Sequence, residues 1–488
     1  MLADRINPKI AVSVVFVSAM FMAIMDITIV NVALPQLAHD FDVSPAHIDS
    51  VVVGFLVSLA VFIPASGWLG DRFGMKRMLL TAIVIFTGAS ALCGLSQNLT
   101  QLVVFRILQG VGGGMLTPTG MALLYRTFPP AERVRASRIL IVPTAFAPAI
   151  GPVLGGLLVT DVSWRWVFFV NLPIGIAALV FGILFLHEHR QPDAGRFDIG
   201  GFLLAGTGLP ALMYALSEGP SRGWGSPTIL GLAVAGVVLL ALLVRYELAH
   251  AHPMIDLHLI GNRLFRSSTI VLFIGMAAFL GTLYVVALFF QVGLGLSALN
   301  AGLSTFPEAI GVMIGAQIST RLYPEVGPRR LIAAGLTGVA VLALCMTFIG
   351  FGTSLWLVRG LMFLLGLSIA HVFTPVQAAA FATISQASTG RGSTLFNTAR
   401  QVGSALGVAI LTTVISAVGV TRLVHGHPHA NLRAFHAAFV VSAALALCAA
   451  VFAFFTVSDE DAAPTMVKRP SKRAQQRQAD AELAAATG

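Results

Sequence analysis

Two acidic residues, Asp26 and Glu308, lie inside long apolar stretches of this 488-residue chain. Asp26 is the one charged residue between Ile10 and Leu34, and Glu308 follows Pro307 in a second such stretch. A carboxylate in hydrocarbon costs at least about 2.5 kcal/mol unless it is protonated, paired or open to water. Burial favours the neutral acid, whereas a nearby cation favours the charged form, so an embedded acid can exchange a proton for a cation. The two residues therefore predict proton-linked binding of cations.

The elements that must hold these acids are membrane-spanning helices. The chain is 57% hydrophobic and only 10% charged, with a mean hydropathy of +0.87, which excludes an ordinary soluble domain. Crossing a hydrocarbon core of about 30 Å takes about 20 apolar residues. We predict an all-α integral membrane protein with fourteen spans, at residues 10–34, 47–68, 78–97, 100–122, 136–159, 164–187, 198–217, 227–247, 268–290, 299–322, 331–350, 354–377, 396–418 and 435–457.

The basic residues predict how these spans are oriented. Most of the 30 Lys and Arg residues fall in the N-terminus, the even-numbered connections and the tail. Because basic loops stay in the cytoplasm, both termini are predicted to be cytoplasmic. The net charge of +9 is then a topology signal, and we expect no nucleic-acid partner. The exceptions are Arg165, Arg222, Arg422 and Arg433 on the other side, and Arg106 and Arg359 within spans.

Weak internal similarity divides the spans into two related halves. Residues 74–79 resemble residues 327–332, and Arg106 and Arg359 lie at matching depths, each followed by glycines and a Thr-Pro pair. Buried arginines at matching depth indicate related bundles, and transporters with such halves bind substrate between them near the midplane. We predict an N-terminal six-helix bundle (1–190), a two-helix insert with cytoplasmic linkers (191–262), a C-terminal six-helix bundle (263–457) and a disordered basic tail (458–488).

The connection after the second span carries a glycine-rich charged motif. It follows the pattern G-x-L-x-D-R-x-G-x-K-R through Gly67, Gly70, Asp71, Arg72, Gly74, Lys76 and Arg77. The glycines allow a tight turn, Asp71 can charge-stabilise a neighbouring helix N-terminus, and Arg72 and Arg77 can hold the cytoplasmic face. A basic anchor without a gating role is the alternative.

Two further glycine motifs lie inside spans. The fifth span follows G-x-x-x-G-P-x-x-G-G through Gly151, Pro152, Gly155 and Gly156, with Ala147 at the first position. Proline removes backbone hydrogen bonds and glycine allows close approach, which suits a bent helix at the seam between halves; plain packing is the alternative. In the fourth span, glycines follow Arg106 without the strand context of a phosphate loop, so helix packing is expected there. Snorkelling of Arg106 stays open.

These motifs, with residues 25–35, 164–173 and 397–407, resemble the major facilitator superfamily and, within it, the fourteen-span drug:proton antiporters. The resemblance covers nearly the whole chain up to Val457. It implies two six-helix bundles plus two inserted helices that work by alternating access. It also implicates Arg106 and the embedded acids of the first and tenth spans, Asp26 and Glu308, in proton coupling and in recognition of cationic substrates.

The predicted site therefore combines proton coupling and substrate binding. We assign protonation to Asp26, and protonation or substrate charge to Glu308, although the reverse assignment stays open. The predicted substrate-binding residues are Asp26, Glu308, Asn31, Tyr284 and Phe306. The alternatives are a structural hydrogen bond or snorkelling for Asp26, helix capping at a break for Glu308, and lipid-facing or core positions for the aromatic residues.

No catalytic or cofactor-binding pattern accompanies these residues. His425, His427 and His429 alternate in a way that could bind a metal, but a polar loop is the favoured interpretation. Cys93, Cys345 and Cys448 lack metal-ligand spacing. The sequence contains no HExxH motif, P-loop or Ser-His-Asp pattern. We predict no enzymatic activity and no cofactor, with the proton gradient as the energy source.

The function predicted from the sequence is proton-coupled export of lipophilic, cationic drugs. The predicted partners are small-molecule substrates, protons and the lipid bilayer, with a periplasmic adaptor if the cell is Gram-negative. We expect a monomer in a bacterial cell (inner) membrane, since Arg outnumbers Lys as in GC-rich genomes. The alternatives are a dedicated exporter of one natural compound, such as a siderophore, lipid or antibiotic, and a non-transporting membrane sensor or enzyme.

Overall fold

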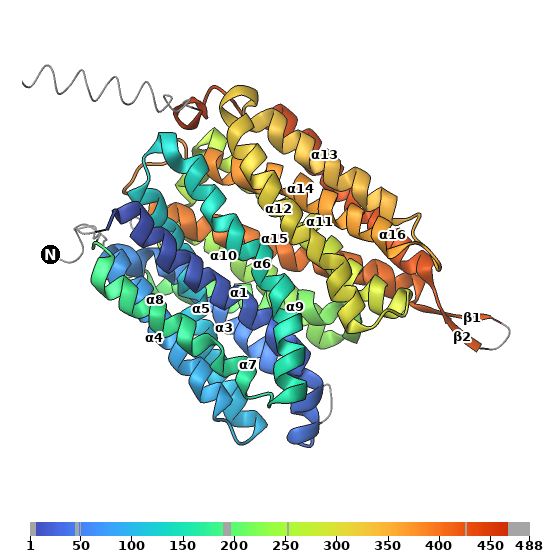
Figure 1. Ribbon diagram of the computed structural model, residues 1–488. Coiled ribbons are helices and arrows are strands. Elements are labelled where there is room, and N and C mark those ends of the chain that lie inside the picture. Colours follow the sequence, from blue (N-terminus) through green and yellow to red (C-terminus); the bar gives the residue numbers. More distant parts are fainter. Residues whose placement is uncertain are drawn as a thin grey trace, which may run out of the picture.

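The computed structural model describes residues 6–43, 48, 50–188, 197–250, 253–424 and 427–466, which form one bundle of long helices (Figure 1). The N-terminal half contains α1 (Pro8–Asp40), α3 (Ser50–Phe73), α4 (Met75–Gly94), α5 (Leu99–Thr127), α6 (Arg133–Asp161), α7 (Trp166–Phe169) and α8 (Asn171–Phe185). The insert contains α9 (Ile199–Arg222) and α10 (Pro227–Ala249). The C-terminal half contains α11 (Arg263–Leu288), α12 (Ala298–Val326), α13 (Pro328–Met346), α14 (Leu355–Ala380), α15 (Thr389–Val418) and α16 (Leu432–Thr456).

Short polar side chains start many of these helices. The first backbone N–H groups of a helix have no partner within it, so a side-chain oxygen placed just before the helix satisfies one of them. Asn98 accepts from the backbone nitrogen of Gln101 at the start of α5, at 2.9 Å. Asn262 does the same for Phe265 at the start of α11, at 3.0 Å. These caps lie next to long apolar stretches and fix where each helix begins.

Every predicted span overlaps a helix of the structure. Twelve described segments are long and apolar enough to cross a membrane, and one of them, Asn300–Met346, contains both α12 and α13. A shorter apolar segment, Phe146–Asp161, lies in α6. The all-helical membrane fold is therefore confirmed, while the count of fourteen crossings and the cytoplasmic termini stay predictions. Helix α1 extends beyond the predicted first span, 10–34, and ends at Asp40.

The two halves pack their helices in the same pattern. In the N-terminal half, α1 packs on α6, α3 on α5, and α4 on α8; in the C-terminal half, α11 packs on α15, α12 on α14, and α13 on α16. We number the helices of each half one to six, with α7 and α8 counted together as the sixth of the N-terminal half. In both halves the first helix then packs on the fifth, the second on the fourth, and the third on the sixth. Figure 1 shows the blue-to-green half beside the yellow-to-red half. The contacts agree with the related halves that the sequence predicts.

Two seams join the halves, one between α3 and α15 and the other between α6 and α12. The insert helix α9 packs against both α3 and α15. Phe202 of α9 contacts Phe62 of α3, with ring centroids 6.2 Å apart. At the end of the insert, Trp224 Nε1 donates to Thr413 Oγ1 of α15 at 2.8 Å. The insert therefore covers the α3–α15 seam.

The halves meet at the end of the bundle where α3 ends and α4 begins, which we call the basic end. Tyr125 stacks on Phe381 across the halves, with ring centroids 4.7 Å apart. Asn397 Nδ2 donates to Met121 Sδ at 3.2 Å. The hydroxyl oxygens of Ser66 and Thr394 lie 3.4 Å apart. These contacts close the basic end in this structure.

The connection between α15 and α16 contains a short β-hairpin rather than the predicted polar loop. Strand β1 (Thr421–Val424) pairs antiparallel with β2 (His427–Ala430), with Thr421 opposite Ala430. The three-histidine pattern lies outside the described side chains, so its metal-binding alternative stays open. The tail beyond residue 466 also lies outside the described residues.

Candidate functional site

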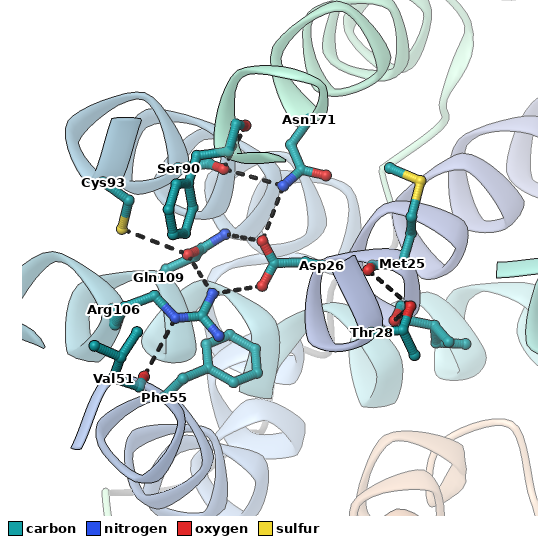
Figure 2. Close-up of polar contacts among 12 residues, drawn as sticks. Met25, Asp26, Thr28, Val51, Phe55, Ser90, Cys93, Arg106, Gln109 and Asn171 are labelled. Atoms are coloured by element: carbon teal, nitrogen blue, oxygen red, sulfur yellow. Dashed lines mark hydrogen bonds and ion pairs between the residues drawn. The ribbon is translucent and has the colours of Figure 1, made fainter. Parts of the chain in front are cut away.

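Asp26 lies at the centre of a buried polar network inside the N-terminal half (Figure 2). Its Oδ2 accepts from Arg106 Nη1 of α5 at 2.5 Å. Its Oδ1 accepts from Gln109 Nε2 at 2.9 Å and from Asn171 Nδ2 at 2.9 Å. All three partners donate, so both carboxyl oxygens of Asp26 have hydrogen-bond partners.

Arg106 is held on every side of its guanidinium group. Its Nη1 also donates to Gln109 Oε1 at 2.8 Å, and its Nε donates to the carbonyl oxygen of Val51 at 3.4 Å. The guanidinium carbon lies 4.2 Å from the centroid of the Phe55 ring. Arg106 is only 1% exposed, so the snorkelling alternative is wrong for this residue. A fully desolvated ion pair with hydrogen bonds at each end is stable only while both partners remain.

A second group of polar residues positions the amide of Asn171. Asn171 Nδ2 donates to Ser90 Oγ at 3.0 Å as well as to Asp26. Ser90 Oγ in turn donates to the carbonyl oxygen of Phe168 at 2.9 Å. Gln109 and Asn171 did not appear among the predicted site residues. Gln109 could have been found, because it lies one helical turn after Arg106 and therefore on the same helix face.

The orientation of Asp26 differs from the expected one. We predicted that Asp26 and Glu308 both belong to one substrate-binding site. Instead, the carboxylate of Asp26 has no exposed surface, and its three hydrogen-bond donors all come from the N-terminal half. The physical reason is the Arg106 guanidinium of α5, which pairs with the carboxylate from within the same half. The structural hydrogen bond that we weighed as an alternative is thus present, and it includes the proposed proton-coupling arginine.

Glu308 has a different environment on α12. It is partly exposed, and its carboxylate makes no hydrogen bond or ion pair within the described part of the chain. The capping alternative is wrong, because α12 continues through Pro307 without a break. A Cβ on Gly366 would lie 1.9 Å from the carbonyl oxygen of Glu308, so α12 and α14 are in close backbone contact at this level. Glu308 is therefore held on a tightly packed helix pair while its carboxylate stays available.

Arg359 does not repeat the environment of Arg106. We expected two buried arginines at matching depth, but Arg359 is only partly buried. Its guanidinium carbon lies 4.7 Å from the ring of Trp356, which is 77% exposed. The side chain packs on an exposed aromatic ring near the start of α14, and it forms no ion pair with a described residue.

The remaining predicted substrate-binding residues lie outside the Asp26 network. Asn31 is exposed on α1. Tyr284 on α11 is 42% exposed and Phe306 on α12 is 36% exposed. None of the three contacts Asp26 or its partners through a hydrogen bond, so their role in substrate binding stays a prediction.

The charged motif places Asp71 at the seam between the halves. Asp71 is buried and forms an ion pair with Arg126 of α5, at 2.6 Å between Nη2 and Oδ1. A Cβ on Gly390, in the first turn of α15, would lie 3.1 Å from Asp71 Oδ1. Asp71 thus faces the N-terminus of a helix from the other half, where a negative charge is favourable. This position agrees with the predicted charge stabilisation of a neighbouring helix.

The rest of the motif fastens α4 to the end of α8. Lys76 Nζ donates to the carbonyl oxygens of Ile183 and Leu186, at 3.0 and 2.7 Å, and so satisfies the C-terminus of α8. Glu188 accepts from the backbone nitrogens of Lys76 and Arg77 at the N-terminus of α4, at 3.0 and 3.3 Å.

The motif glycines make these contacts possible. Gly74 has a φ of +103°, which favours glycine. Gly67 brings α3 close to α15, because a Cβ there would lie 2.6 Å from Thr394 Oγ1, whereas a Cβ on Gly70 would contact the flexible Met75 side chain. Arg72 is exposed on the surface of the basic end.

The fifth-span motif packs within the N-terminal half rather than across the seam. A Cβ on Gly151 would lie 2.0 Å from Thr28 Oγ1, and one on Gly155 would lie 3.2 Å from the carbonyl oxygen of Ile29. Both contacts are with α1. Gly156 faces open space, and the Pro152 side chain lies outside the described side chains. The glycines therefore fix α6 against the helix that carries Asp26, while α6 itself borders the other half through α12.

Comparison with known families decides the identity of the fold. The family model described as "Major Facilitator Superfamily" matches residues 16–408. The chain belongs to the major facilitator superfamily. This major facilitator protein is therefore a multi-pass membrane transporter rather than an enzyme.

Its similar relatives are bacterial proteins named for drug resistance. It is 32% identical over 454 residues to the "Putative multidrug resistance protein MdtD" of Serratia proteamaculans (strain 568), covering 92% of this chain and 94% of that protein. It is 31% identical over 409 residues to the "Multidrug resistance protein B homolog" of Mycobacterium tuberculosis (strain H37Rv), covering 82% of this chain and 75% of that one. The finding supports a drug transporter.

Solved structures of major facilitator proteins share the fold. The human organic anion transporter MFSD10 (TETRAN) aligns with a TM-score of 0.67 at 16% identity, over 92% of this chain and 100% of that chain. The proton:xylose symporter XylE aligns with a TM-score of 0.61 at 14% identity, over 94% of this chain and 99% of that chain. At these identities the likeness concerns the fold alone.

Proposed function

We propose that this major facilitator protein exports lipophilic, cationic drugs in exchange for protons by alternating access. The observation that carries the proposal is the buried Asp26–Arg106 pair with its two amide donors, because it places a titratable acid and its counter-charge inside a membrane bundle. The drug-resistance names of its bacterial relatives support the substrate class. In this proposal the chain crosses a bacterial inner membrane fourteen times as a monomer, both termini are cytoplasmic, and the proton gradient supplies the energy. A periplasmic adaptor is an added requirement in a Gram-negative cell.

The proton step uses Asp26 and Arg106. A proton that arrives from outside neutralises Asp26, so the Coulomb attraction that joins α1 to α5 is lost. Arg106 keeps Gln109 and the Val51 carbonyl as partners, which limits the cost of the uncompensated charge. Release of the proton to the inside restores the ion pair. The pair is thus a switch between two arrangements of α1 and α5.

The substrate step uses the acid of the other half. Glu308 carries a carboxylate that no side chain of the described residues neutralises, on a helix that packs against α6 at the seam. A lipophilic cation gains an ion pair with Glu308 and apolar contact with neighbouring side chains such as Phe306. Protonation of Glu308 from outside weakens that ion pair and assists release.

The basic end supplies the gate. Asp71, Arg126 and the first turn of α15 hold the two halves together there, along with the Tyr125–Phe381 stack. Opening toward the cytoplasm requires these contacts to break together. Exchange of one proton for one monovalent cation would move no net charge, whereas exchange of two protons would also draw on the membrane potential. Each proton exchanged supports about a tenfold cation gradient for each pH unit across the membrane.

The test is proton release by the purified protein when substrate is added. Addition of a lipophilic cation such as ethidium to protein in weakly buffered detergent is expected to release protons, with saturation at the same concentration that saturates cation binding. An uncharged lipophilic dye should release no proton from Glu308, because it forms no ion pair with the carboxylate. Cation binding without any proton release would contradict coupling. A panel of chemically varied dyes separates multidrug export from export of one dedicated compound.

A further inference from the structure

The two seams between the halves differ in what covers them. The insert helix α9 packs along the α3–α15 seam, whereas the α6–α12 seam has no such helix among its contacts in the described chain. Arg138 of α6 reaches across this second seam, and its Nη1 donates to Gln317 Oε1 of α12 at 2.5 Å. The bridge lies toward the basic end. An uncovered seam in a membrane protein faces lipid.

Three arginines gather around that bridge. Arg135 lies one turn before Arg138 on α6, and Arg321 lies one turn after Gln317 on α12. The positive charges of Arg135 and Arg321 both act on Arg138. Arg135 and Arg321 are exposed, and neither makes an ion pair with a described residue.

The acidic residue nearest along this face of α12 is Glu325, one turn beyond Arg321. It has an interaction of its own. Even if its charge is counted, the cluster keeps a net charge of about +2 at the surface, from three arginines and one glutamate. Such a concentration of positive charge between helices from different halves favours an anion that can contact all three.

The same face of α12 continues into the membrane as an apolar stripe. Ile310, Ile314 and Ile318 are 39%, 43% and 37% exposed. They precede Arg321 by eleven, seven and three residues, so they share its helix face. At 1.5 Å per residue, Ile310 lies about 16 Å from Arg321 along the helix axis, close to the thickness of one leaflet of hydrocarbon.

We propose that the α6–α12 seam binds one anionic phospholipid, with its phosphate on Arg135, Arg138 and Arg321 and an acyl chain along Ile310, Ile314 and Ile318. The lipid contacts both halves while the basic end is closed, so it favours that state. This site is separate from the Asp26 network and from Glu308, and the proposal does not depend on proton coupling. The stripe selects a lipid over free phosphate, since phosphate has no chain to place there.

The first test is lipid retention measured by native mass spectrometry. Purified protein in neutral detergent is titrated with phosphatidylglycerol or phosphatidylcholine. The wild type is expected to retain one phosphatidylglycerol, and the R135Q/R321Q variant to bind it about tenfold more weakly. The matched control, R263Q/R330Q, removes the same charge from exposed arginines on α11 and α13 and should bind as the wild type does. Equal weakening in both variants would overturn the proposal.

Two further experiments can refute the lipid proposal. Glycerophosphoglycerol, which is the headgroup without acyl chains, should not displace the lipid at equal concentration; displacement would identify a plain phosphate site instead. If R135Q/R321Q does not fold, Ile314→Trp in the otherwise unchanged protein supplies a second readout. In mixed nanodiscs brominated phosphatidylglycerol should quench this tryptophan more than brominated phosphatidylcholine, whereas Val341→Trp on α13 should show no preference. No preference at position 314 would overturn the lipid site.

Discussion

In the N-terminal half Asp26 and Arg106 form a buried ion pair, whereas in the C-terminal half Glu308 and Arg359 lie apart on α12 and α14. The halves share the same helix packing, so the difference comes from the side chains and not from the fold. Gln109 and Asn171 complete the N-terminal network, while Arg359 packs on an exposed tryptophan. The acids of the two related bundles thus have different electrostatic surroundings. Asp26 pairs with an arginine of its own half, whereas Glu308 forms no ion pair with a described residue.

The largest expected effect is a difference in stability between substitutions of Arg106 and of Arg359. Arg106→Gln leaves Asp26 buried without its cation, so we expect it to lower the free energy of unfolding by about 3–5 kcal/mol. Arg359→Gln removes a half-buried cation–π contact and should lower it by less than about 1 kcal/mol. Unfolding in detergent, followed by circular dichroism, gives both values. Equal losses in the free energy of unfolding would show that Arg106 and Arg359 contribute equally to stability.

The next largest effect concerns the packing of α6 against α1. Gly151→Ala would put a methyl group against Thr28 of α1, and we expect a loss of about 1–3 kcal/mol in the free energy of unfolding. Gly156→Ala, in the same motif, meets open space and should change it by less than about 0.5 kcal/mol. The same unfolding assay compares them. A neutral Gly151→Ala would mean that α6 can move away from α1 at no cost.

A smaller effect sharpens the role of Glu308. Glu308→Gln removes the charge and keeps the shape, so binding of a lipophilic cation should weaken about tenfold, or about 1.4 kcal/mol. Binding of a neutral lipophilic substrate should be unchanged. Glu218→Gln is the matched control, because Glu218 is an acid of α9 that already pairs with Arg222. Equal weakening for cationic and neutral substrates would argue against charge recognition by Glu308.

The sequence predicted the fold well because the physical signal is strong. A run of about 20 apolar residues in a membrane must satisfy its own backbone hydrogen bonds, so it forms a helix. That rule located each predicted span on a helix. It could not fix the end of α1, since Pro35 costs a membrane helix one hydrogen bond but need not stop it. The hairpin between α15 and α16 lacked any hydropathy signal.

The partners of Asp26 were only partly predictable. Asp26, Arg106 and Asn171 lie within the motifs that carry the resemblance, and Arg106 was assigned to proton coupling. The direction in which Asp26 points could not be predicted, because α1 is apolar on all sides and its sequence pattern does not show which face meets α5. Asn171 belongs to a helix 145 residues away in sequence. Its approach to Asp26 follows from the packing of α8 on α1, which sequence periodicity does not encode.

The central claim is that Asp26 carries the proton that drives export. The most direct test is efflux of a monovalent lipophilic cation from proteoliposomes under an imposed pH gradient, with the membrane potential clamped at zero. The Asp26→Asn variant must first be shown to be folded and monodisperse. The account predicts that the wild type accumulates the cation against its gradient and that Asp26→Asn does not respond to pH. Full pH-driven transport by Asp26→Asn would contradict the account.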